Sequence, residues 1–306
     1  MLTRLGALAA LVAVLTFLAG TVGIPGSAAS RENRTSDEHA VPRKGPSPVI
    51  DVAHRGASAY APENTLAAID EAQARGATAV EVDVQRTRDG QLVLIHDTTL
   101  ARTTDVEEVF PDRAPYNVGD FTLTEIRRLD AGAWFDAGYA GERVPTLQQG
   151  LDRLRGHGLN LLLEVKSPQL YDGIETDIAE VLWRNRWWLT PAGQGYPPRL
   201  TVQSFDWAAM ELSHSLLPDV PHGLLGKVPA AEIPTYARWA DQINPSHTDI
   251  DAGYVEAVHA AGMRTFVYTV NDPADMRTAI DRGVDGIISD RPDVARKIIE
   301  ELAALP

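Results

Sequence analysis

The sequence predicts a TIM barrel, a closed ring of eight parallel strands surrounded by helices. Apolar, β-rich runs alternate with amphipathic helical patterns along about 260 residues, and this alternation is typical of α/β folds with a parallel sheet. The alternative that the same pattern allows is a doubly wound open sheet. The eight strands are expected at 48–53, 79–85, 160–166, 200–204, 222–226, 242–245, 264–270 and 285–289.

The helices between these strands carry recognisable start and stop signals. Residues 63–76 contain a helical pattern that opens with the Glu-Asn-Thr of Pro-Glu-Asn-Thr and ends at a glycine. Glycine is the residue that commonly follows a last helical turn. Residues 146–158 open with Thr and Gln in the spacing of a capping box. Two further helices are expected over 251–262 and 271–283, because each range begins at Asp or Asn and ends at Gly.

One interval departs from the alternation and predicts an insertion. After the second strand, residues 86–97 contain an Asp-Gly turn followed at once by another apolar run. A two-residue turn permits only an antiparallel return, so Leu92–His96 is expected to be a hairpin arm. Residues 98–145 lack sustained periodicity. They predict a small insertion at the C-terminal ends of the strands, where TIM barrels keep their active sites.

Residues 1–29 have the pattern of a secretory signal peptide. Arg4 precedes an uncharged apolar run over 5–22, and small residues at 27–29 offer a cleavage site. The alternative is a membrane anchor, although the run is only marginally long for a bilayer span. Residues 30–46 are polar and predict a disordered linker. We therefore expect a secreted protein with its domain over 47–306 and no stable membrane association after cleavage.

The charge and cysteine content limit the partners and the chemistry. The chain has a formal net charge of −14, which disfavours binding to nucleic acid or to an anionic membrane through bulk charge. An anionic ligand would need local cations or a metal ion. The chain has no cysteine, so its stability must come from the core and not from disulfides. The sequence does not determine the oligomeric state.

Carboxylates on two neighbouring barrel strands form the first candidate site. Glu81 and Asp83 alternate with valines, so both side chains point toward the barrel interior. Glu164 and Lys166 share the same face on the next strand. Three inward carboxylates suit Ca²⁺ or Mg²⁺, and without a cation one acid must be protonated. The alternative is a structural ion-pair network of these acids with Arg55 and Lys166.

Two histidines stand at chain positions that lead to the same barrel mouth. His54 ends the first strand and His96 ends the hairpin arm. Histidine titrates near neutrality, so one can accept a proton while the other donates one. Arg55 and Lys166 suit an anionic, phosphate-bearing substrate. A Schiff-base role for Lys166 is disfavoured, because Glu164 on the same face would raise the lysine pKa. The other six histidines are expected to be structural or solvated.

Six stretches of the chain resemble the successive motifs of the glycerophosphodiester phosphodiesterase family. The resemblance covers residues 49 to about 296 and implies a TIM barrel that hydrolyses glycerophosphodiesters to glycerol 3-phosphate and an alcohol, with a divalent metal. The matching stretches are "AHRGASAYAPENT", "EVDVQRTRDGQLVLIHDTTLARTT", "AGAWFDAGYAGERVPTLQQGL", "LEVKSP", "VQSFD" and "GVDGIISDRPD".

The resemblance also implies roles for individual residues. Tyr268 stands where the family often has Trp, so a different preference for substrate size is expected. Glu63 and Asn64, in Pro-Glu-Asn-Thr, are expected to be partly structural. Ca²⁺ is the expected ion and Mg²⁺ the alternative. The matching positions are His54 and His96 for the acid and base, Glu81, Asp83 and Glu164 for the metal, and Arg55 and Lys166 for the phosphate.

Several functional alternatives stay open at this point. Either water or the glycerol hydroxyl of the substrate can be the nucleophile, and either histidine can be the acid. A lysophospholipase D-like or sphingomyelinase D-like enzyme on the same scaffold would need an apolar groove at the barrel mouth. A non-enzymatic binding protein would have no use for a paired acid and base. Residues 106–118 and 134–139 could provide such a groove, with Val109, Phe110, Tyr116, Trp134 and Phe135.

Overall fold

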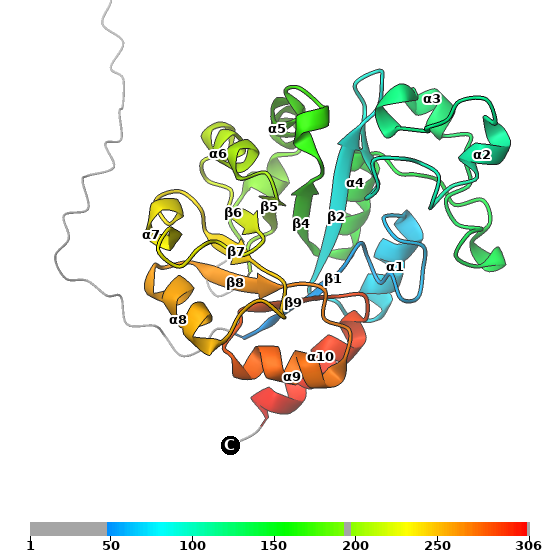
Figure 1. Cartoon of the computed structure of the whole chain (residues 1–306). Coiled ribbons are helices and arrows are strands. Elements are labelled where there is room, and N and C mark those ends of the chain that lie inside the picture. Colours follow the sequence, from blue (N-terminus) through cyan, green and yellow to red (C-terminus); the bar gives the residue numbers. More distant parts are fainter. Residues whose placement is uncertain (1–47, 193–196, 305–306) are drawn as a thin grey trace, which may run out of the picture. The chain divides into compact units, whose positions relative to one another are not determined.

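Eight parallel strands close into a ring in the computed structural model, which describes residues 48–192 and 197–304 (Figure 1). They pair in the order β1-β9-β8-β7-β6-β5-β4-β2, and a pairing of β1 with β2 closes the ring. The predicted TIM barrel is confirmed, and the open sheet is wrong. The strands are β1 (Ile50–Ala53), β2 (Ala79–Arg86), β4 (Asn160–Val165), β5 (Leu200–Ser204), β6 (His222–Leu225), β7 (Gln242–Asn244), β8 (Arg264–Val267) and β9 (Gly286–Ser289).

Two predicted features of the N-terminal region cannot be compared with this structure. The signal peptide and the linker lie outside the described residues. Within 48–192 and 197–304, no helix has both the length and the apolar character needed to cross a bilayer.

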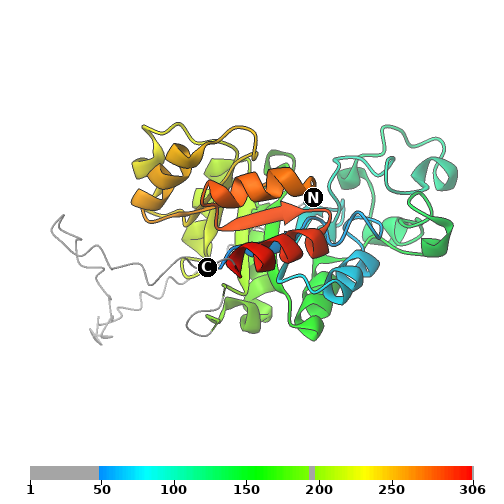
Figure 2. The same cartoon turned by 90° about the horizontal axis from the view of Figure 1, so that it is seen from below.

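Helices surround the ring of strands, as Figures 1 and 2 show. Thr146 and Gln149 form the predicted capping box, and Asp251 caps its helix as expected. The helix predicted to begin near Asn271 is capped by Asp272. The helices around the barrel are α1 (Leu66–Ala74), α4 (Leu147–His157), α5 (Ile174–Arg184), α6 (Trp207–Leu216), α7 (Ile233–Tyr236), α8 (Ala252–Ala260), α9 (Pro273–Asp281) and α10 (Pro292–Ala303).

The hairpin arm is confirmed as β3 (Leu92–Leu94), which pairs antiparallel with the end of β2. The predicted two-residue turn is wrong, because the connection has three residues, 88–90. The N–H of Gly90 donates to the Thr87 carbonyl, and the N–H of Thr87 donates to the Gln91 carbonyl. Gly90 takes a positive φ of 78°, which lets the chain reverse with one extra residue. β3 thus covers the edge of β2 beyond the end of β1.

The insertion forms a small lobe with an apolar core of its own. In both views it lies to one side of the barrel (Figures 1 and 2). Phe121 and Ile126 are fully buried within it. Its short helices explain why the sequence shows no sustained period there. They are α2 (Val106–Val109), η1 (Val118–Asp120), α3 (Leu123–Ile126) and η2 (Ala137–Tyr139).

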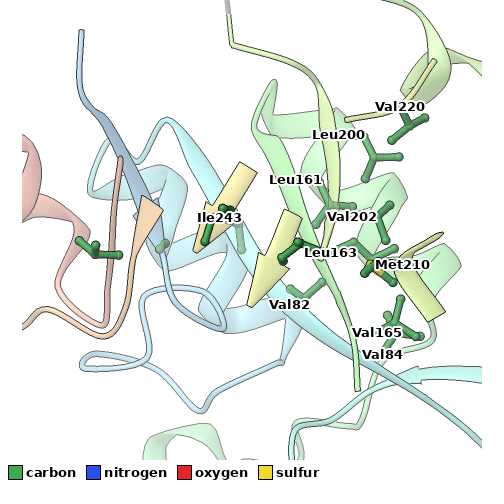
Figure 3. Packing of buried hydrophobic residues seen from close by; sticks show 14 of the residues in the cluster. Val82, Val84, Leu161, Leu163, Val165, Leu200, Val202, Met210, Val220 and Ile243 are labelled. Atoms are coloured by element: carbon green, nitrogen blue, oxygen red, sulfur yellow. The ribbon is translucent and has the colours of Figure 1, made fainter. Parts of the chain in front are cut away.

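The strand alternation divides apolar from polar side chains. The valines of β2 point outward into the layer shared with the helices, as do Leu161 and Leu163 of β4, and Figure 3 shows part of this layer. Inside the barrel, Val52, Leu162, Phe266 and Ile288 form a small apolar plug. A Cβ on Gly286 would lie 2.6 Å from the ring of Phe266, so glycine makes room for that ring. The predicted acids Glu81, Asp83 and Glu164 occupy inward-facing positions of β2 and β4, in the same alternation as Leu162.

Candidate active site

A cavity of about 250 Å³ opens at the C-terminal ends of the barrel strands. Of the predicted site residues, all but Asp83 line it, and Asp83 is 1% exposed behind its wall. A larger cavity of about 370 Å³ lies at the opposite end of the barrel, and none of the predicted site residues lines it. The residues that line the smaller cavity are His54, Arg55, Glu81, His96, Glu164, Lys166, Gln203, Phe205, Leu225, Tyr268, Thr269 and Ile288.

The three predicted acids converge in the wall of this cavity. Glu81, Asp83 and Glu164 are all buried, and one oxygen from each lies within 4.8 Å of the others. Asp83 and Glu164 are direct partners in the register of β2 and β4. Glu81 Oε1 and Asp83 Oδ1 are buried without a hydrogen-bond partner. Orphaned carboxylate oxygens are costly unless a cation binds them, so this oxygen-only set fits a hard divalent ion.

The protonation of these acids depends on burial and on one another. Burial raises the pKa of Glu81 well above its ordinary value, and the charges of Asp83 and Glu164 raise it further. Burial also raises the pKa of Glu164 to about 7. Burial would raise the pKa of Asp83, but Arg55 and Lys166 lower it overall. Without a further positive charge, the three acids therefore favour a partly protonated state near neutral pH.

Both predicted cations already contact these acids. Arg55 Nε lies 3.4 Å from Asp83 Oδ2. Lys166 Nζ lies 2.8 Å from Glu164 Oε1 and 3.7 Å from Asp83 Oδ1. The predicted ion-pair network is thus present and still leaves the orphaned oxygens. Burial lowers the pKa of Lys166, but Glu164 and Asp83 outweigh it and the net pKa is raised, which argues against a Schiff-base lysine.

The Pro-Glu-Asn-Thr segment makes structural contacts beside these groups. Glu63 Oε1 accepts a hydrogen bond from Arg55 Nη1 at 2.9 Å. Asn64 Nδ2 donates to Asp83 Oδ2 at 2.8 Å, and Asn64 Oδ1 accepts from the Asp83 N–H at 3.1 Å. Thr65 caps α1 through its side chain. The segment therefore holds one acid and one cation of the site while it starts a helix.

His54 is held by the carboxylate of Asp290, which lies near the C-terminal end of the sequence. Its Nδ1 lies 2.6 Å from Asp290 Oδ1. Asp290 also accepts hydrogen bonds from Ser58 and Asn271. Burial would raise the pKa of Asp290, but the hydrogen bond and charge of His54 lower it overall. An ionised carboxylate only accepts hydrogen bonds, so Nδ1 of His54 carries a proton. The other ring nitrogen, Nε2, is not engaged by Asp290.

The backbone after His54 turns sharply away from the site. Arg55 has a φ of 56° and Gly56 a φ of 84°. A Cβ on Gly56 would lie 2.5 Å from the Cβ of Ala68 in α1. Glycine is therefore required there both by the left-handed backbone and by the close approach of the helix.

His96 is held in the same manner by its chain neighbour. Its Nδ1 lies 2.7 Å from Asp97 Oδ1. Burial lowers the pKa of His96, and although Asp83 opposes this, the net pKa is below the ordinary value. The main chain is fixed from β2, because Gln85 Nε2 donates to the carbonyls of Ile95, His96 and Asp97 at 2.9, 2.9 and 2.6 Å.

Aromatic side chains form one wall of the cavity. The rings of Tyr268 and Phe205 meet edge to face, with centroids 5.8 Å apart and an interplanar angle of 79°. Tyr268 lies just beyond β8, where the strand predicted over 264–270 has ended and only a bridge to Ser246 continues it. Lys166 Nζ lies 5.6 Å from the centroid of the Phe205 ring. A substrate bound to the cations would thus also meet an apolar surface.

The insertion residues that could have formed an apolar groove do not line this cavity. Val109, Phe110 and Tyr116 pack into the insertion's own core. The rings of Trp134 and Phe135 meet edge to face, and this pair is not part of that core, with Trp134 41% exposed. None of the five side chains lines the cavity. Of the aromatic residues named from the sequence, Tyr268 lines the cavity.

Four functional candidates were missed at the sequence level. Asp97 and Phe205 follow predicted strand ends in "HD" and "SFD", and their position was an available signal. Asp290 also follows a strand, in "ISD", but no sequence pattern links it to His54. Arg102, which contacts Asp97, lies in the insertion, where the chain shows no sustained period; its place in "HDTTLARTT", within a stretch that resembles a family motif, was an available signal.

The fold and the site together define a TIM-barrel protein with a buried acidic cluster of the kind that can hold a divalent ion and with two carboxylate-paired histidines. The model of the glycerophosphoryl diester phosphodiesterase family matches residues 54–294. The chain belongs to this family. Glycerophosphodiester phosphodiesterase from Bacillus subtilis is 34% identical over 291 residues, covering 90% of this chain and 91% of the relative. The enzyme of the same name from Caldanaerobacter subterraneus is 34% identical, and the match covers 82% of this chain and 97% of that relative.

A solved structure agrees with the architecture. The structure of a phosphodiesterase from Oleispira antarctica, in complex with the product sn-glycerol-3-phosphate, matches with a TM-score of 0.72. It is 29% identical, and the match covers 83% of this chain and 97% of that one.

Proposed function

We propose that this protein is a secreted, metal-dependent phosphodiesterase that hydrolyses glycerophosphodiesters to glycerol 3-phosphate and an alcohol. The observation that carries the proposal is a single cavity that joins two histidine–carboxylate pairs, three buried acids and two cations. Family membership supports it, as does the product bound by the Oleispira antarctica relative. Secretion is supported by the sequence pattern of residues 1–29.

The charge of the substrate explains why these residue types gather here. Phosphodiesters are anions that repel nucleophiles, so hydrolysis needs positive charge at the phosphate. Glu81, Asp83 and Glu164 would hold a divalent ion, for which we propose Ca²⁺ with Mg²⁺ as the alternative; such an ion acts as a Lewis acid. Arg55 and Lys166 bind the phosphate oxygens from the cavity wall.

The two histidines supply the proton transfers. Each keeps Nδ1 on a carboxylate, so Nε2 is the atom that exchanges a proton with the substrate. One histidine removes the proton from the attacking water or glycerol hydroxyl while the new P–O bond forms. The other gives a proton to the alcohol oxygen as the second P–O bond breaks. If the glycerol hydroxyl attacks, water then opens the cyclic phosphate to give glycerol 3-phosphate. The aromatic wall of Phe205 and Tyr268 packs against the apolar part of the substrate.

The activity test uses the purified mature protein with a panel of phosphodiesters. Release of glycerol 3-phosphate from glycerophosphocholine is followed with a coupled dehydrogenase, before and after chelation and metal add-back. Lysophosphatidylcholine and sphingomyelin in the same panel test the lipid-directed alternative. Turnover of these lipids alone would replace the proposed substrate class, and no turnover of any phosphodiester would refute the proposed reaction.

Variants of the two histidines test the assigned chemistry. His54→Ala and His96→Ala should each lower kcat by roughly 10²–10⁴, the usual contribution of one proton-transfer group. A nitrophenyl phosphodiester, whose leaving group needs no proton, should rescue the variant that lacks the acid. His157→Ala is the matched control, because His157 also pairs with a carboxylate, Asp70 at 2.7 Å, but does not line the cavity. Losses below about tenfold in both variants would contradict the acid–base assignment.

A further inference from the structure

We infer that Arg102 is a positioning residue that sets the orientation of His96 through Asp97. The inference rests on the proposed function and adds a residue to its site. Arg102 follows the hairpin arm by a few positions, and it is absent from the lining of the cavity. It therefore acts on the substrate only through other residues.

The contact between Arg102 and Asp97 is bidentate. Arg102 Nε donates to Asp97 Oδ2 at 2.6 Å, and Arg102 Nη2 donates to Asp97 Oδ1 at 2.9 Å. Asp97 Oδ1 is also the atom that lies 2.7 Å from His96 Nδ1. Two parallel hydrogen bonds from a planar guanidinium fix the plane of a carboxylate. The plane of Asp97 in turn fixes the direction of the imidazole.

The other edge of the guanidinium is anchored on the loop before α1. Arg102 Nη1 donates to Glu63 Oε2 at 2.8 Å, and Nη2 donates to Glu63 Oε1 at 2.7 Å. The Glu63 side chain is 12% exposed and also accepts from Arg55. Arg102 is thus held on a nearly buried partner, although its own side chain is 44% exposed. It joins the loop that carries Arg55 to the arm that carries His96.

Removing Arg102 should affect Asp97 and His96 more than Glu63 and Arg55. Arg55 would keep its contacts with Glu63 and Asp83. Asp97 would keep only His96, because among residues 48–192 and 197–304 no other cation pairs with its carboxylate. Gln85 would still hold the main chain of this segment through three carbonyls. The loop would stay in place while the Asp97 carboxylate and the His96 ring gain freedom.

The first experiment measures steady-state kinetics of Arg102→Gln with glycerophosphocholine. We expect kcat to fall by about tenfold to a hundredfold, because misplacing a catalytic group by about 1 Å has an effect of this order. KM should change by less than about threefold, because Arg55 keeps its contacts. The matched control is Arg88→Gln, another exposed arginine that pairs with a glutamate, Glu125, outside the cavity. A raised KM with unchanged kcat would place the effect at Arg55 and overturn the inference.

The second experiment tests whether Arg102 acts through His96. In a His96→Ala background, Arg102→Gln should lower kcat by less than about twofold, since the group that it orients is gone. An undiminished loss in that background would overturn the inference. Added guanidinium, compared with sodium chloride, should restore part of the kcat of Arg102→Ala. It should not restore the kcat of the double variant that carries His96→Ala and Arg102→Ala. Equal rescue of both, or of neither, would count against the inference.

Two controls separate folding and function from positioning. If Arg102→Gln is recovered unfolded, Arg102→Lys replaces it. A lysine keeps the charge but not the bidentate contact, so kcat should still fall. An unchanged kcat would overturn the inference. An inactive wild-type protein would refute the proposed function, whereas an active wild type with a fully active Arg102→Gln would refute only the role of Arg102.

Discussion

Asp290 Oδ1 lies 2.6 Å from His54 Nδ1, although 236 positions separate the two residues in the chain. The contact exists because β1 and β9 are neighbours in the barrel and both end at its active-site mouth. Ser58 and Asn271 donate to the same carboxylate at 2.9 and 2.6 Å. This carboxylate therefore has a fixed direction, and it gives that direction to His54.

Replacing Asp290 should weaken catalysis more than binding. Asp290→Asn keeps the size of the side chain but places an amide among donors, so His54 loses its fixed tautomer. We expect kcat to fall by about tenfold to a thousandfold, with little change in KM. Asp293→Asn is the control, because Asp293 pairs with Arg75 and Tyr60 outside the cavity. Similar kinetics for the two variants would argue against an Asp290–His54 pair in catalysis.

Metal removal should abolish turnover, and Ca²⁺ or Mg²⁺ should restore it. Glu81→Ala should lose activity and, by calorimetric titration, metal affinity. The chelated variant should be as stable as the chelated wild type or more so, because the acids repel one another. Glu175→Ala removes another buried glutamate, on α5 outside the cavity, and should bind metal normally. Full activity after exhaustive chelation would refute metal dependence.

The hydroxyl and the ring of Tyr268 should behave differently. Burial raises the pKa of this hydroxyl to about 12, so the group stays protonated and is a poor base near neutral pH. Tyr268→Phe should therefore keep kcat/KM within about twofold, whereas Tyr268→Ala should raise KM by about tenfold through loss of the wall beside Phe205. If Tyr268→Phe lost as much as Tyr268→Ala, the hydroxyl and not the ring would be the functional part.

His222 should make the fold sensitive to acid. It is fully buried, its Nδ1 bonds to the Val220 carbonyl and its Nε2 to Ser213 Oγ. Burial lowers its pKa from 6.5 to about 4. The unfolded chain therefore takes up a proton below about pH 6.5 while the folded protein does so only near pH 4. This contribution to stability is complete above pH 6.5 and is lost as the pH falls toward 4, about 3 kcal/mol in all.

Urea unfolding of the wild type and of His222→Asn at several pH values measures this effect. The side-chain amide introduced by this substitution can still donate to the Val220 carbonyl but does not titrate. The free energy of unfolding of the variant should fall less between about pH 7 and pH 4. Parallel curves for the two proteins would show that His222 does not govern the acid sensitivity.

If the proposed secretion takes place, the mature protein should begin near Ser30. Expression of the full chain in a bacterial host with a secretion pathway, followed by mass spectrometry of the purified protein, measures the mature N-terminus. An intact Met1 on membrane-bound protein would favour the anchor alternative over the signal peptide.

The sequence by itself determined the barrel and which candidate side chains gather at its mouth, because both depend on local periodicity. Alternation of Glu81 and Asp83 with valines fixed which side chains enter the lumen. The strand-end positions of His54 and His96 placed them at one mouth once a barrel was assumed.

Only the tertiary structure decided how these groups are held. Asp290 reaches His54 because the ring closes, and Arg102 reaches Asp97 and Glu63 because the insertion folds back over the first loop. The core of the insertion takes up Val109, Phe110 and Tyr116, which could otherwise have lined a groove at the barrel mouth. Contacts of this kind depend on side-chain packing between segments distant in the chain, and a period of two or of 3.6 residues carries no information about them.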